Sequence, residues 1–184
     1  MIILWILIGA IIVFGLYAMG VYNKLVTKRS MMEEGWSGID VQLKKRHNLI
    51  PNLIETVKGY AKHEKETLNA VIEARNTALN ADGIKAQTGA ENKLNTALAN
   101  VFALSEAYPD LKANTNFIQL QDELSAIEGD VEKSRRYFNA TVRDNNIMVE
   151  SFPSNIVANI AGFELGEFFE IEEAIERAAP QVKF

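Results

Sequence analysis

The stretch MIILWILIGAIIVFGLYAMGVY, residues 1–22, decides the fold because it carries no charged side chain and consists almost entirely of aliphatic, aromatic and glycine residues. At about 1.5 Å per residue it forms a helix roughly 33 Å long, which is enough to cross a hydrocarbon layer of about 30 Å. We therefore predict a single transmembrane anchor over residues 1–22, through which the chain contacts the lipid bilayer.

Basic residues flank this stretch on one side only. Lys24, Lys28 and Arg29 follow it directly, and the positive-inside rule then places the N-terminus outside and the C-terminal domain in the cytoplasm. A secretory signal peptide would have a positive start, a shorter apolar stretch and a small-residue cleavage site, for which AMG at residues 18–20 is a poor candidate. We expect a retained anchor and a single-pass protein of the cytoplasmic membrane.

Composition excludes several classes of site. The chain has no cysteine, so disulfides, thiolate metal sites and thiol nucleophiles are excluded. The net charge is -5, with a basic segment at residues 24–65 and an acidic one at residues 150–184. Nucleic-acid-binding domains are basic, so we expect no nucleic-acid partner. The roughly 160 residues after the anchor are enough for one domain with a sizeable core.

Apolar residues after the anchor recur at steps of three and four, which is typical of helices that bury one face. One pattern begins at Trp36 and continues towards Leu79, and we expect a kink or a restart at Pro51 because proline lacks a backbone donor. The remaining pattern predicts a loop at residues 81–83, helices over residues 88–107 and 117–152, and a short helix over residues 156–161 that ends at Gly162.

The helix predicted over residues 117–152 has an unbroken stripe from Phe117 to Phe152. Its second half includes Ser134, Thr141 and Asn145, which we expect to pair across a bundle or to specify register. Two helices of about forty residues with short connections predict an all-α fold, an elongated antiparallel bundle that follows the transmembrane helix. The predicted organisation is an anchor over residues 1–22, a juxtamembrane helix or linker over 23–35, a bundle over 36–169 and a loose acidic tail over 170–184.

Charged residues cluster around the expected kink at Pro51. They are Asp40, Lys44, Arg46, His47 and Glu55. We interpret most of them as intrahelical pairs on a solvated face, and the alternative is a cluster that grips a partner or a lipid headgroup. Arg46 differs because its position in the pattern points inward, where a guanidinium needs an acceptor. The candidate acceptors are Glu128, Glu132 and Asn145.

The apolar segment at residues 156–169 exceeds what a small bundle readily covers, because Phe163, Leu165, Phe168 and Phe169 follow one another closely. Packing back onto the bundle is the favoured interpretation. Contact with another subunit or a partner comes second. Insertion into a membrane comes third, because glutamates interleave with the aromatic residues and oppose approach to anionic lipids.

No catalytic constellation is recognisable. His63 and Glu64 resemble part of a zinc-protease helix, but that site needs a second histidine at position 67, where the chain has Thr67. We therefore predict no enzyme activity, no metal, no cofactor and no small-molecule substrate.

One segment, GWSGIDVQLKKRHNLIPNLIETVKGYAKHE at residues 35–64, closely resembles the signature of the LemA family of bacterial membrane-anchored helical proteins. Supporting segments are VYNKLVTKR at 21–29, AYPDLKAN at 107–114, RRYFNATVRDNN at 135–146 and FPSNIVANIAGF at 152–163. The resemblance implies one N-terminal transmembrane helix, a cytoplasmic antiparallel bundle and no established enzymatic activity. The chain departs from the family pattern at Asn48, where an acid is common, and at Gly35, where alanine is usual.

These observations together predict a non-enzymatic scaffold that self-assembles as a homo-oligomer or recruits other membrane proteins at the inner face of a bacterial cytoplasmic membrane. The resemblance also admits an adaptor of a membrane protease or signalling enzyme, and a membrane-remodelling protein. The candidate interaction residues are Trp36, Asp40, Arg46, Pro51, Glu55, Phe163, Phe168 and Phe169.

Overall fold

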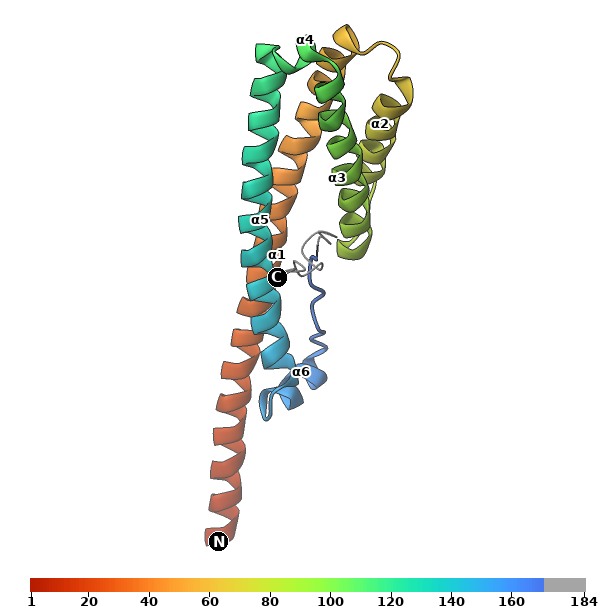
Figure 1. The fold of residues 1–184 in the computed structure, drawn as a ribbon. Coiled ribbons are helices and arrows are strands. Elements are labelled where there is room, and N and C mark those ends of the chain that lie inside the picture. The colour runs from red at the N-terminus through yellow and green to blue at the C-terminus, as the bar shows by residue number, and fades with distance from the viewer. Residues whose placement is uncertain (171–184) are drawn as a thin grey trace, which may run out of the picture. The chain divides into compact units, whose positions relative to one another are not determined.

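The computed structural model describes residues 1–170, and over this range the chain is helical without a β-strand. The predicted all-α class is confirmed (Figure 1). The helices are α1 (Ile2–Tyr60), α2 (Lys65–Leu79), α3 (Ile84–Ala107), α4 (Pro109–Lys112), α5 (Thr115–Glu150) and α6 (Ser154–Ala161). The tail predicted at residues 170–184 lies, from residue 171 onward, outside the described residues.

The described residues form two compact units, and α1 and α5 contribute to both. Unit 1 contains residues 1–40 and 133–168, and unit 2 contains residues 41–132 together with Phe169 and Glu170. The boundaries predicted at residues 22, 35 and 169 stay predictions.

Unit 2 has an apolar core to which five helices contribute. The direction of the chain alternates from one long helix to the next, and α2 and α3 lie side by side as an antiparallel pair (Figure 1). The core includes Ile50, Leu53, Val57, Leu68, Val71, Leu94, Leu98, Val101, Leu111, Phe117 and Leu124. Most of these positions belong to the predicted stripes, so burial explains the spacing of the apolar residues.

Helix α1 differs from the prediction in two ways. It does not restart at Pro51, which lies inside a continuous helix, and it ends at Tyr60 instead of continuing towards Leu79. A turn at residues 61–64 separates it from α2. Gly59 lies one residue before the end of the helix, where its low helix propensity favours termination.

Glycines mark two boundaries: the loop predicted at residues 81–83 and the end predicted at Gly162 are confirmed, whereas α3 begins at Ile84, four residues before the predicted start at 88. Gly83 precedes α3 with φ of 83°, and Gly162 ends α6 in the left-handed conformation with φ of 71°. Side chains with a Cβ rarely adopt these angles, which explains glycine at both positions. The stripe predicted to reach Phe152 is wrong at its end, because α5 stops at Glu150 and the Phe152 side chain is exposed.

Unit 1 begins with an apolar surface. The first part of α1 contains a stretch with a mean hydropathy of 2.7, none of which is buried within the structure, and it is long enough to cross a membrane. The first buried residue is Val21, which shares a small core with Leu25, Val149, Ala158 and Phe163. The fold is therefore all-α with an N-terminal candidate transmembrane helix.

The two long helices of unit 1 approach closely near Gly35. A Cβ added at Gly35 would lie 3.2 Å from Cα of Phe138 on α5. The neighbouring Trp36 ring stands 5.5 Å from the Phe138 ring, centroid to centroid. Gly35 therefore has a packing role in α1, whereas a Cβ at Gly38 would meet nothing within 4 Å.

An ion pair also joins these two helices. Lys28 Nζ on α1 donates a hydrogen bond to Asp144 Oδ2 on α5 at 3.0 Å. This ammonium group lowers the pKa of the Asp144 carboxyl below its ordinary value. The pair is partly exposed, so its contribution to stability is modest.

Candidate functional site

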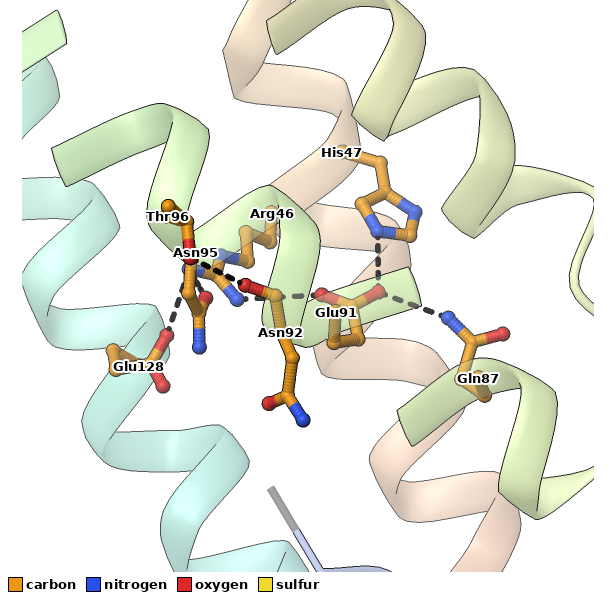
Figure 2. A network of polar contacts seen from close by, with 8 residues as sticks. All are labelled: Arg46, His47, Gln87, Glu91, Asn92, Asn95, Thr96 and Glu128. Carbon is orange, nitrogen blue, oxygen red and sulfur yellow. Dashed lines mark hydrogen bonds and ion pairs between the residues drawn. The ribbon is translucent and has the colours of Figure 1, made fainter. Parts of the chain in front are cut away.

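A buried network of charged and polar side chains lies inside unit 2 (Figure 2). Arg46 and His47 reach it from α1, and Glu91 reaches it from α3; all three are buried. Charged residues are almost never buried without partners, because losing water costs each ion several kcal/mol. The geometry of the network therefore has to compensate for that cost.

Glu91 is the centre of the network. Its Oε2 accepts a hydrogen bond from Nη1 of Arg46 at 3.3 Å, and its Oε1 lies 2.8 Å from Nε2 of His47. The Oε1 atom also accepts from Nε2 of Gln87, one helical turn earlier on α3, at 2.9 Å (Figure 2). Both carboxylate oxygens are thus satisfied inside the protein.

Arg46 links three helices. Its Nη2 donates to Oδ1 of Asn95 on α3, and Oε2 of Glu128 on α5 lies 3.1 Å away. The contact with Glu128 is an ion pair without good hydrogen-bond angles, and the Glu128 side chain is 38% exposed. The guanidinium therefore holds α1 to both α3 and α5 through charge.

The acceptors predicted for Arg46 are partly correct. Glu128 is confirmed, and Glu132, which is exposed on α5, stays a prediction. Asn145 is wrong, since its side chain donates to the backbone oxygen of Glu164 within unit 1. The prediction missed Glu91, although a signal existed: Glu91 stands three residues before Leu94 and extends the inner stripe of α3.

A second polar contact explains why α1 continues through Pro51. A helical residue donates its N–H to the carbonyl four residues earlier, so the missing donor of Pro51 leaves the His47 carbonyl without its usual partner. Nε of Arg75 on α2 donates to this carbonyl at 2.7 Å. The restart predicted at Pro51 does not occur because a side chain supplies the lost hydrogen bond.

The other residues of the predicted polar cluster have different surroundings. Glu55 is exposed and pairs with Lys58 at 2.7 Å on the same helix, as the solvated-face interpretation expects. The ring of Pro51 is exposed, and Asp40 is partly buried in unit 1. Of the predicted cluster, Arg46 and His47 are therefore the members that enter the interior of unit 2.

The aromatic candidates near the C-terminal end also have different positions. We call residues 163–168 the strap, because they run as irregular chain after α6. Phe163 is buried, packs edge-on against Tyr22 at 5.7 Å between ring centroids, and lies 5.4 Å from the guanidinium carbon of Arg29. Phe169 is fully buried, whereas Phe168 is exposed.

Two asparagines of α5 hold the strap. Asn146 pairs with the backbone of Gly166 in both directions: its Nδ2 donates to the Gly166 oxygen at 3.0 Å, and its Oδ1 accepts from the Gly166 nitrogen at 2.8 Å. Asn145 is buried and donates to the Glu164 oxygen at 3.2 Å. Asn145, at the end of the α5 stripe, therefore binds the backbone of the strap. The periodicity of the sequence does not indicate this contact.

Titratable side chains of the described residues take part in contacts between helices. Within residues 1–170 no group of three or more His, Asp or Glu side chains is placed to hold a metal ion. His63 is exposed, and the neighbouring Glu64 accepts a hydrogen bond from the Tyr108 hydroxyl at 3.0 Å, which raises the pKa of Tyr108. The network around Arg46, His47 and Glu91 joins α1 to α3 and, through Glu128, to α5.

Comparison with known proteins gives a consistent family. A sequence model of the LemA family matches residues 35–184. The chain is 24% identical over 167 residues to Protein LemA of Metamycoplasma hominis, with 87% of this chain and 76% of the relative covered. It is also 24% identical over 179 residues to Magnetosome protein MamQ 2 of Paramagnetospirillum magneticum and to Magnetosome protein MamQ of Magnetospirillum gryphiswaldense. These two alignments cover 83% of the chain and 66% of each relative, so the chain spans slightly less than two thirds of their length.

Proposed function

The chain belongs to the LemA family, and from this premise we propose that it is a membrane-anchored helical scaffold that acts by binding other proteins or further copies of itself. The observation that carries the proposal is the division of α1. Residues 2–20 of α1 expose apolar side chains, whereas the helix from Val21 onward contributes to packed protein cores. One helix thereby connects a lipid-compatible surface to the folded units.

The charge distribution supports an orientation for this anchor. Lys24, Lys28 and Arg29 lie on α1 directly after the apolar surface, and basic residues of this kind stay on the cytoplasmic side during insertion. The proposed location is the cytoplasmic membrane of a bacterium, with the N-terminus outside and both units in the cytoplasm.

Exposed apolar side chains support an interaction role. Ile147 on α5 and Leu165 and Phe168 on the strap are all exposed in unit 1. Exposed apolar side chains that lie close together often form the contact surface for another protein. Self-association through the strap is the form of the proposal that can be tested most directly.

The experiment is native mass spectrometry of the full chain extracted from membranes in a mild detergent. The proposal expects oligomers or co-extracted proteins, and it expects Phe168→Ser to reduce them. Leu79→Ser on α2 is the matched control, because Leu79 is similarly exposed but lies in unit 2. A chain that stays monomeric at high concentration and captures nothing would overturn the scaffold proposal.

Orientation has its own test. The chain contains no cysteine, so Tyr137→Cys on exposed α5 introduces a single thiol. A membrane-impermeant maleimide should label it in opened cells and leave it unlabelled in intact cells. Labelling in intact cells would reverse the proposed orientation.

An adaptor role towards a membrane protease or signalling enzyme stays the alternative. Extraction of one such enzyme together with the chain, in place of self-association, would favour it.

A further inference from the structure

An uncharged apolar corner joins α5 to the strap. We define the corner as residues 151–162, which include α6 and contain no charged side chain. Phe152 is 80% exposed and Ile160 is 82% exposed, and Ile156 is exposed as well. Large apolar side chains with this degree of exposure are costly to leave in water, so the corner needs a cover.

The position of the corner in unit 1 indicates what covers it. The inner side of α6 is fixed by Ala158, which is fully buried in the same small core as Val21 and Leu25 of α1. These two α1 residues come directly after the exposed apolar run that ends near residue 20. At about 1.5 Å per residue, twenty residues span roughly 30 Å, so Val21 and Leu25 lie at the level of the lipid headgroups. Figure 1 shows α6 beside this part of α1.

We propose that the corner inserts Phe152, Ile156 and Ile160 into the headgroup region of the same membrane that holds residues 2–20. This inference rests on the proposed membrane anchoring. The exposed apolar surface of α1 and that of the corner then form one continuous lipid contact. The bilayer is favoured as occupant because the corner is held at its surface by the anchor and needs no partner to be recruited.

Basic side chains near the corner favour contact with anionic lipid. Lys24 is exposed on α1 at this level, and Arg29, which also makes an exposed ion pair with Glu33, lies against Phe163 directly after the corner. Both are basic groups that anionic headgroups attract. Glu164 follows the corner, but its backbone is held by Asn145, more than one helical turn before the end of α5. The strap therefore leads Glu164 and Glu167 back along α5 and away from the corner, whereas Glu150, exposed at the end of α5, stays next to it.

The test uses site-directed spin labels on the full chain, which has no cysteine of its own. Phe152→Cys and Ile160→Cys, each carrying a nitroxide, are reconstituted in vesicles of phosphatidylcholine and phosphatidylglycerol. The ratio of oxygen accessibility to nickel-chelate accessibility then reports depth. Tyr137→Cys is the matched control, because position 137 is exposed on α5 in the same unit but roughly 20 Å before the corner along the helix. Ile12→Cys reports the anchor itself.

The expected result is a ratio at positions 152 and 160 that rises above the ratio at 137 towards the value at 12. An aqueous ratio at the corner with a lipid-like ratio at 12 would overturn the inference and leave the anchoring intact. An aqueous ratio at 12 as well would overturn the proposed anchoring. Corner labels that are immobilised and shielded from both reagents would also overturn the inference, because they would indicate contact with protein.

Discussion

Replacement of Glu91 by leucine tests whether the buried network holds unit 2 together. Glu91 is fully buried and accepts hydrogen bonds from Arg46 and Gln87 while contacting His47. Glu91→Leu keeps the side-chain volume similar and removes both acceptor oxygens. It therefore leaves the Arg46 guanidinium buried with Glu128 as its one remaining charged partner in the part of the chain that the structure describes.

The magnitude follows from this geometry. Removing one partner of a buried ion pair costs about 3–5 kcal/mol, because the other charge stays buried without compensation. Glu128 remains 3.1 Å from Arg46 and is partly exposed, so the loss belongs at the lower end of that range. For a chain of this size, about 3 kcal/mol lowers the midpoint of thermal unfolding by roughly 6–12 °C.

Circular dichroism of the full chain in lipid nanodiscs measures this midpoint. Glu55→Leu is the matched control, since Glu55 makes an exposed pair with Lys58, and it should change stability by less than about 1 kcal/mol. A double variant, Arg46→Met with Glu91→Leu, should lose less than the sum of the two single losses, because it leaves no buried charge unpaired between these positions. Equal midpoints for Glu91→Leu and Glu55→Leu would refute the reasoning.

Two further predictions concern the glycines of α1 and the ion pair of unit 1. Gly38→Ala should stabilise the chain by about 0.5–1 kcal/mol through helix propensity, and Gly35→Ala should gain less because its Cβ would meet Phe138 Cα at 3.2 Å; equal gains in urea unfolding would contradict the close approach. The pKa of Asp144 is lowered by Lys28, so its contribution to stability is present above the ordinary carboxyl pKa and is lost as the pH falls through the lower folded value. In Asp144→Asn, the free energy of unfolding should therefore fall less steeply between neutral and acid pH than it does in the original chain. An unchanged dependence on pH in this range would count against the Lys28 pair.

The helices and their buried faces were predictable because they are local properties. The spacing of Leu94, Leu98 and Val101 indicates an inner face before any partner is known, and the structure buries all three. Gly83 and Gly162 likewise act through their own backbone angles. The division of the predicted first helix at residues 61–64 was missed, because nothing in the apolar spacing there distinguishes a turn from a continued helix.

The polar contacts were harder to predict because each joins positions that are far apart in the chain. Glu91 follows Arg46 by 45 residues, and Glu164 follows Asn145 by 19. A single sequence indicates that a buried guanidinium or amide needs an acceptor, but only the topology decides which acceptor is near. The inward positions of Arg46 and Glu91 were therefore both predictable from the stripes of their helices, whereas the bond between the two was not.

Pro51 illustrates how such a distant contact changes a local rule. Proline disfavours a helix interior for two reasons: it lacks a hydrogen-bond donor, and its ring crowds the preceding turn. Arg75 removes the first cost by donating to the His47 carbonyl, and the ring itself faces solvent. The same two consecutive residues of α1 thus serve the fold in different ways, since the Arg46 and His47 side chains bind Glu91 of α3 while the His47 backbone binds Arg75 of α2. The signature around Pro51 is accordingly explained by packing of α1 against α2 and α3, and a role in binding a partner is not needed to account for Arg46 or His47.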